Sequence, residues 1–127
     1  MTKKDVERWL NRAYKINEEI KLLKEEKYSL YKLAAENGSS KRVEYSALID
    51  ERINALFNIK IEIQKAINKI QSGKLRTVLI CRYILFMQWE RIADIMKYDV
   101  RHIYRIHSNA VELMQNIIDN DLKKGGK

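Results

Sequence analysis

The absence of proline constrains the fold of this chain more than any other feature. The 127 residues include no proline and only four glycines, whereas average usage of about 5% would give roughly six prolines. Because these two residue types interrupt helices most strongly, their scarcity favours long, unbroken helices. A charged fraction of 33% beside a hydrophobic fraction of 46% suits amphipathic helices with solvated outer faces. We therefore predict an all-α fold, built as one domain or two very small modules.

The first part of the sequence contains two amphipathic segments, residues 4–36 and 43–71, separated by the turn-forming residues 37–40. In the first segment, which Lys27 interrupts, apolar residues alternate at the spacings of 3 and 4 typical of a heptad seam: Trp9, Ala13, Ile16, Ile20, Leu23, Leu30 and Ala34. In the second, the seam recurs at intervals of seven and is widened by neighbours: Ile49, Leu56, Ile63 and Ile70, with Ile53, Ile59, Ala66 and Ile67. This pattern predicts a long antiparallel helical hairpin over residues 1–73.

After a short break at Ser72-Gly73, residues 74–120 have the layout of a helix-turn-helix. A supporting helix is predicted from Leu75, Val78, Leu79, Tyr83 and Ile84. A short helix at 89–96 and a three-residue turn at 97–99 follow. A second helix then opens with Asp99, which is placed to accept hydrogen bonds from the first free backbone N–H groups. Beyond this module, residues 121–127 are expected to form a flexible tail.

The second helix of the module has two different faces. Its inward face is apolar: Ile103, Ile106 and Ala110. Arg101 and Arg105, one helical turn apart, lie on the opposite face together with Ser108. A helix with an apolar back and arginines at i and i+4 on its front suits the major groove of DNA. A helical hairpin packed on a third helix would show the same inward periodicity, and arginines are ordinary on a solvated face.

The residues from about Leu75 to Met114 also resemble a known family. The motif LxxxLICRYI…WxxIAxxMxYDxRHIYRIHxxAVxLM is similar to RinA/ArpU-type phage transcriptional regulators, whose C-terminal helix-turn-helix is like that of bacterial sigma factors. The resemblance implies a regulator of phage or prophage genes in the bacterial host cytoplasm, and it raises contact with host RNA polymerase as a further expectation. One departure is the lack of a glycine in the turn, which predicts that Lys97 or Tyr98 adopts a strained conformation.

These observations define an expected contact surface for double-stranded DNA. Arg101 and Arg105 are expected to contact base edges, supported by His102, Tyr104, Ser108 and Asn109. Lys97 and Arg91 are expected to contact phosphates, and Tyr98 to touch the DNA backbone. A net charge of +8 favours a polyanionic partner, although charge alone does not say which one.

Some apolar residues of the hairpin lie outside its two seams: Tyr14, Leu22, Tyr28, Phe57 and Ile61. A two-helix hairpin cannot bury two faces by itself. This surface is therefore expected to meet the C-terminal module, a second copy of the protein or another partner. We favour a second copy, because dimers of small DNA-binding proteins bind paired half-sites. The hairpin is then the oligomerisation element of a homodimer.

Several classes of protein do not fit the sequence. Cys81 is the only cysteine, which excludes an intrachain disulfide and suits a reducing cytoplasm. It falls in an apolar run, residues 78–87, that Arg82 interrupts and that is too short to span a membrane. His102 and His107 are five residues apart and cannot chelate one metal ion from a single helix face. We find no motif for an enzyme and none for a cofactor.

Two other functions stay open at this point. A phage DNA-packaging protein similar to a small terminase subunit also joins a helix-turn-helix to an oligomerising hairpin. A helical adaptor that binds only proteins would carry the same basic face as ordinary solvated surface.

Overall fold

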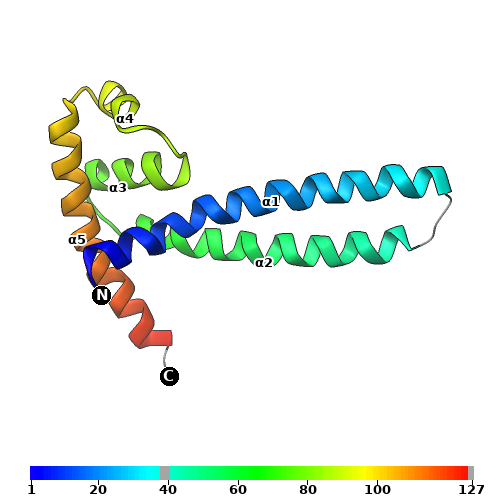
Figure 1. The fold of residues 1–127 in the computed structure, drawn as a ribbon. Helices are drawn as coiled ribbons and strands as arrows, with labels where there is room; N and C mark the ends of the chain where they lie inside the picture. The colour runs from blue at the N-terminus through cyan, green and yellow to red at the C-terminus, as the bar shows by residue number, and fades with distance from the viewer. Residues whose placement is uncertain (38–40, 126–127) are drawn as a thin grey trace.

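The computed structural model describes residues 1–37 and 41–125, and every regular element within these ranges is helical (Figure 1). In chain order the elements are α1 (Lys3–Asn37), α2 (Arg42–Asn68), α3 (Gly73–Leu79), the π-helix η1 (Ile80–Ile84), α4 (Trp89–Met96) and α5 (Val100–Gly125). The prediction of an all-α fold is confirmed. None of the helices in the described ranges combines the length and apolar character needed to cross a bilayer. The turn expected at Gly38 lies outside the described residues.

The two long helices α1 and α2 lie side by side and run in opposite directions (Figure 1). They form a rod that extends away from the other helices, α3, η1, α4 and α5. The predicted seam of α2 is confirmed, because its heptad residues are buried: Ile49, Leu56, Ile63 and Ile70. Polar pairs also link the two helices. Lys27, which interrupts the seam of α1, donates to Asp50 at 2.8 Å, and Arg52 donates to Glu19 at 2.9 Å. The interruption is therefore matched by a partner on the facing helix.

The base of the rod and the C-terminal half of α5 share one hydrophobic core, which we call the base core. Its buried residues come from α1, α2, the connection after α2, α3, η1 and α5: Val6, Leu10, Ala13, Ile63, Ala66, Ile67, Ile70, Leu79, Tyr83, Ala110, Val111, Met114 and Ile118. The predicted seam of α1 begins at Trp9, but Trp9 is only partly buried whereas Val6 and Leu10 are fully buried. The domain boundary expected at residue 73 falls between two helices, but residues from both sides of it pack into the same base core.

A second core lies beneath α4 and the first turns of α5. Its buried residues are Val78, Cys81, Ile92, Ala93, Ile103 and Ile106. The inward orientation predicted for Ile103 and Ile106 is confirmed. Cys81 is buried beside them, and this burial raises the pKa of its thiol. The predicted supporting helix is present as two elements, since the α-helical pattern of α3 gives way to the wider π-helical turns of η1 after Leu79.

The C-terminal end of α5 differs from the prediction. The tail expected from residue 121 is wrong for residues 121–125, because α5 remains helical as far as Gly125. One reason is an ion pair with the residue that caps the end of α2, in which Lys69 Nζ donates to Asp121 Oδ1. Residues 126–127 lie outside the described residues.

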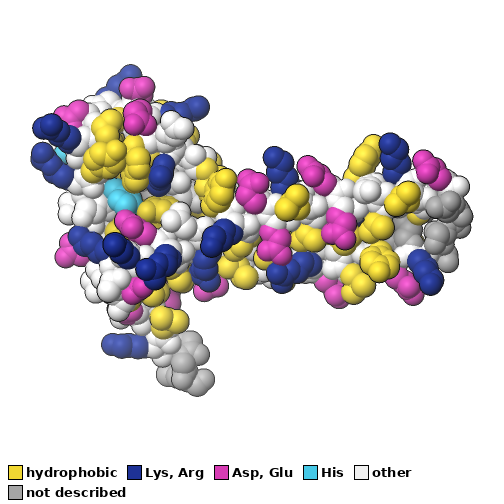
Figure 2. Space-filling model, viewed as in Figure 1, with side chains coloured by type: hydrophobic (Ala, Val, Ile, Leu, Met, Phe, Trp, Pro, Cys, Tyr) yellow, Lys and Arg dark blue, Asp and Glu magenta, His cyan; other side chains and the backbone are white. Residues whose placement is uncertain are grey.

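The rod carries large apolar side chains on its surface, visible as yellow patches in Figure 2. Tyr28 is 72% exposed, and Leu22 and Phe57 are also exposed. Of the off-seam residues predicted to meet another surface, Tyr14 contacts Phe86 of the C-terminal module but stays 52% exposed. The apolar surface farther along the rod is not covered by the C-terminal module.

The base core predicts a sharp contrast between two neighbouring residues of α5. Met114 is fully buried in this core, whereas Leu113 is 42% exposed. Met114→Ala should lower the free energy of unfolding by about 2–5 kcal/mol, because it removes buried atoms and leaves a cavity. Leu113→Ala should change it by about 0.5 kcal/mol or less, as is usual for exposed positions. Urea denaturation followed by circular dichroism measures both, and equal effects would contradict the packing described above.

Candidate nucleic-acid interface

A tight turn joins α4 to α5. Lys97 ends α4 in the left-handed conformation, with φ 62° and ψ 40°, and Tyr98 N donates to Ala93 O at 3.1 Å. For a residue with a side chain this conformation costs roughly 1–2 kcal/mol, and glycine is the usual choice at such a helix end. The predicted strain in the turn is confirmed, and it falls on Lys97. The same conformation turns the chain sharply enough that only three residues, 97–99, separate α4 from α5.

Asp99 determines where α5 begins. Its Oδ1 accepts a hydrogen bond from His102 N at 2.9 Å, which confirms the predicted cap. The first turns of α5 are therefore held at a defined start. Arg101 and Arg105 fall within these first two turns, about 6 Å apart along the helix axis.

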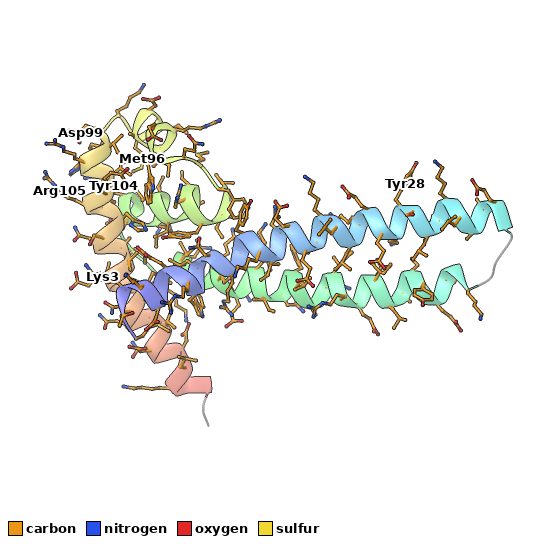
Figure 3. The ribbon with its side chains drawn as sticks, viewed as in Figure 1. Lys3, Tyr28, Met96, Asp99, Tyr104 and Arg105 are labelled. Carbon is orange, nitrogen blue, oxygen red and sulfur yellow. The ribbon has the colours of Figure 1, made fainter. Side chains whose placement is uncertain are left out.

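The exposed face of α5 contains most of the predicted DNA contacts. Arg101, Tyr104, Arg105 and Asn109 are exposed, whereas Ile103, Ile106 and Ala110 on the opposite face are buried. Figure 3 shows Arg105 pointing away from the body of the protein. Arg91 and Lys97, the two predicted phosphate contacts, are exposed on α4 and at its end. These basic side chains are therefore accessible to solvent on α4, at the α4–α5 turn and on α5.

Three aromatic or imidazole side chains of this surface are held by ring contacts. Tyr104, which is 46% exposed, makes an edge contact with Trp89 at a centroid distance of 5.2 Å. Tyr98 and His102 make a similar contact at 4.6 Å, and both are partly buried. Lys74 Nζ lies 4.9 Å from the centre of the Tyr98 ring. These residues have a packing role, and Tyr104 also keeps an exposed edge.

Ser108 has a partner that was not predicted. Its Oγ accepts a hydrogen bond from Lys3 Nζ at 2.9 Å, and Ser108 is partly buried rather than fully outward. Nearby, Gln115 Nε2 donates to Met1 O at 2.7 Å. The N-terminus of α1 therefore lies against the middle of α5 (Figure 3). No signal in the sequence points to Lys3, because the contact joins residues 105 positions apart and depends on the packing of the base core.

Behind this surface lies a buried polar pair, Tyr83 and His107. Tyr83 Oη and His107 Nε2 form a hydrogen bond of 2.7 Å, and His107 also makes an edge contact with Trp89. Burial is the main cause that lowers the pKa of His107 to about 4, and the charges of Arg82 and Lys3 act in the same direction. Burial, followed by the charge of Glu7, raises the pKa of Tyr83. His107 thus lies on the packed side of α5, and near neutral pH its imidazole is uncharged.

Within the described ranges, no three His, Cys, Asp or Glu side chains are grouped so that they could hold a metal ion. Comparison with models of protein families, with curated proteins and with solved structures finds no match for this chain. The family resemblance therefore rests on its sequence motif and stays a prediction.

The lowered pKa of His107 predicts a specific dependence of stability on pH. Unfolded histidine has a pKa of 6.5, so the unfolded chain takes up a proton at a higher pH than the folded protein does. The contribution of neutral His107 to the free energy of unfolding is fully present above pH 6.5. It is lost as the pH falls toward 4, by about 3 kcal/mol in total. Urea denaturation at a series of pH values from 7 to 4 measures this loss.

His107→Gln is the matched control, because glutamine keeps a hydrogen-bonding group and does not titrate. Between pH 6.5 and 4 the free energy of unfolding of this variant should fall less than that of the wild type, and the difference should equal the loss attributed to His107. An identical pH dependence in the two proteins would show that His107 does not titrate in this way.

Proposed function

We propose that this chain is a sequence-specific regulator of transcription that binds double-stranded DNA through α4, the Lys97 turn and α5, arranged as a sigma-like helix-turn-helix. One observation carries the proposal. Arg101 and Arg105 are exposed one turn apart at the beginning of α5, directly opposite a fully packed face, and the Asp99 cap defines the start of that helix. A recognition helix needs this combination of a rigid back and an unobstructed basic front.

The chemistry of the exposed side chains suits base recognition. A guanidinium group can donate two parallel hydrogen bonds to O6 and N7 of guanine in the major groove, which is the commonest specific contact. Tyr104 is 46% exposed and suits contact with a thymine methyl group, and Asn109 and His102 add further donors beside the arginines. Arg91 and Lys97 flank this face and suit phosphates, and the net charge of +8 favours binding at low salt.

The exposed apolar residues of the rod support self-association as part of the same proposal. Tyr28, Leu22 and Phe57 leave apolar surface on α1 and α2 that a second copy would cover. A two-fold dimer joined through the rod would present two α5 helices to paired half-sites. The assignment to phage or prophage genes, the bacterial cytoplasm and contact with host RNA polymerase rests on the family resemblance.

Selection of bound sequences from a random pool of duplexes tests the function directly. Enrichment of one motif supports sequence-specific binding, and a palindromic motif supports a dimer. Mass measurement in solution separates the packaging alternative, because a ring of eight or more subunits would favour a terminase-like protein. A chain that binds no duplex DNA would favour the protein-binding adaptor.

Arginine variants of α5 give the sharpest test of the contact residues. Arg101→Ala or Arg105→Ala should each weaken binding to the selected sequence by about 1–3 kcal/mol relative to random DNA, because a bidentate base contact is lost. Lys97→Ala should weaken binding to both DNAs about equally and reduce the dependence of log affinity on log salt by about 0.9. Fluorescence anisotropy with labelled duplexes provides these affinities.

The side chains replaced in these variants, Arg101, Arg105 and Lys97, are all exposed. Helix content and thermal midpoint should therefore change little, and they serve as controls. If the arginine variants keep full preference for the selected sequence, α5 is not the helix that recognises the bases.

A further inference from the structure

A line of surface pockets runs from the N-terminal turns of α1 to the beginning of α4. The first pocket is lined by four residues of α1: Arg8, Asn11, Arg12 and Lys15. The second shares Asn11 with it and adds Tyr14, Arg82 and Phe86. The third shares Phe86 and ends at Arg91. Neighbouring pockets share a residue and are therefore adjacent, and we call the three together the basic furrow.

The charge of the basic furrow is almost entirely of one sign. Five cationic side chains line it, and no aspartate or glutamate does: Arg8, Arg12, Lys15, Arg82 and Arg91. Carboxylates of α1 lie nearby. Asp5 accepts a bond from Arg8 Nη1 at 3.3 Å on the surface, and Glu7 is close enough to the phenol of Tyr83 to raise its pKa. The furrow therefore keeps an excess of positive charge.

Arg12 has hydrogen-bonding capacity that the chain does not use. Its guanidinium carbon lies 4.7 Å from the centre of the Trp9 ring, and its Nε donates to Trp9 O at 3.1 Å. Its Nη2 is buried and has no hydrogen-bond partner among the described residues. A buried donor without an acceptor is unfavourable. Because Arg12 also lines the first pocket, a small shift of its guanidinium toward a bound phosphate would satisfy this donor.

Phe86, where two of the pockets meet, has a strained backbone. Its φ is 58°, a conformation rarely adopted by a bulky side chain. The ring is held by an edge contact with Tyr14 at 5.3 Å, and Lys60 Nζ lies 6.0 Å from its centre. Backbone strain of this kind concentrates at sites with a function, where the surrounding structure maintains it.

The basic furrow adjoins the outward surface of α5. Arg82 lies 4.4 Å from the centre of the Trp89 ring, and the same ring contacts Tyr104 of α5. The charges of Arg82 and Lys3 both act on His107, and Lys3 is bonded to Ser108. Figure 2 shows dark blue side chains in a row over the N-terminal part of α1, on the face that also shows basic side chains over α5. One extended ligand can therefore contact both regions.

We propose that the basic furrow binds the phosphodiester backbone of the DNA that flanks the segment contacted by α5. This inference rests on the proposed function and extends that function by assigning a second DNA-contact region on α1 and η1. Arginine and lysine side chains that follow the backbone position a protein on the duplex without reading its sequence. The contact region would lengthen the DNA site beyond the few base pairs within reach of α5.

The test compares a short duplex, which contains only the selected sequence, with the same duplex extended by random flanking base pairs. The variants are Arg8→Ala and Lys15→Ala in the full-length chain, and Lys24→Ala on the exposed distal part of α1 is the control of equal charge. On the extended duplex, each lost phosphate contact should reduce the slope of log affinity against log salt by about 0.9. Between 50 and 200 mM salt the variant should therefore lose about 3.5-fold less affinity than the wild type. Binding to the short duplex should be unchanged.

The control variant should behave as the wild type on both duplexes. If Arg8→Ala and Lys15→Ala match the control on the extended duplex, or weaken both duplexes equally with unchanged salt dependence, the furrow does not bind flanking phosphates. In either case the proposed function still holds, because the wild type recognises its sequence. A wild type that binds neither duplex would overturn both proposals and favour an acidic protein segment as the occupant of the furrow.

Discussion

The packing of α5 against the base of the rod is the interaction on which the rest of the structure depends. Met114 and Ile118 of α5 are buried with Val6 and Leu10 of α1 and Ile63 of α2. Apolar burial supplies the main favourable free energy of folding, and here residues from both ends of the chain contribute to the same core. The base core is therefore incomplete in the hairpin alone and in the C-terminal helices alone.

This arrangement couples the direction of the rod to the exposed face of α5. The same helix carries the base core on its C-terminal half and Arg101 and Arg105 on its first turns. Because close-packed cores resist small displacements, a rod joined to a second copy would fix the separation of two α5 helices. In the proposed function, the spacing of half-sites on DNA is then a property of the whole chain and not of the helix-turn-helix alone.

The parts of the molecule that were predicted correctly depend on local sequence patterns. The heptad of α2, the Asp99 cap and the strain at the turn follow from spacing and from the conformational limits of individual residues. The parts that were missed depend on contacts between distant residues. The bond between Lys3 and Ser108, and the helical residues near Asp121 paired with Lys69, exist only because α1, α2 and α5 meet at the base core. The change from α3 to the π-helix η1 could not be predicted, because no proline or glycine lies at that position in the sequence.

Hydrogen exchange of backbone amides, followed by mass spectrometry on the full-length chain, tests the shared core most directly. Residues 63–70 of α2 and 110–118 of α5 should exchange with the same free energy of opening, and that value should equal the free energy of global unfolding measured with urea. Peptides from these two regions would then lose protection together as denaturant is added. Exchange of residues 110–118 through an opening that leaves residues 63–70 protected would contradict a single core.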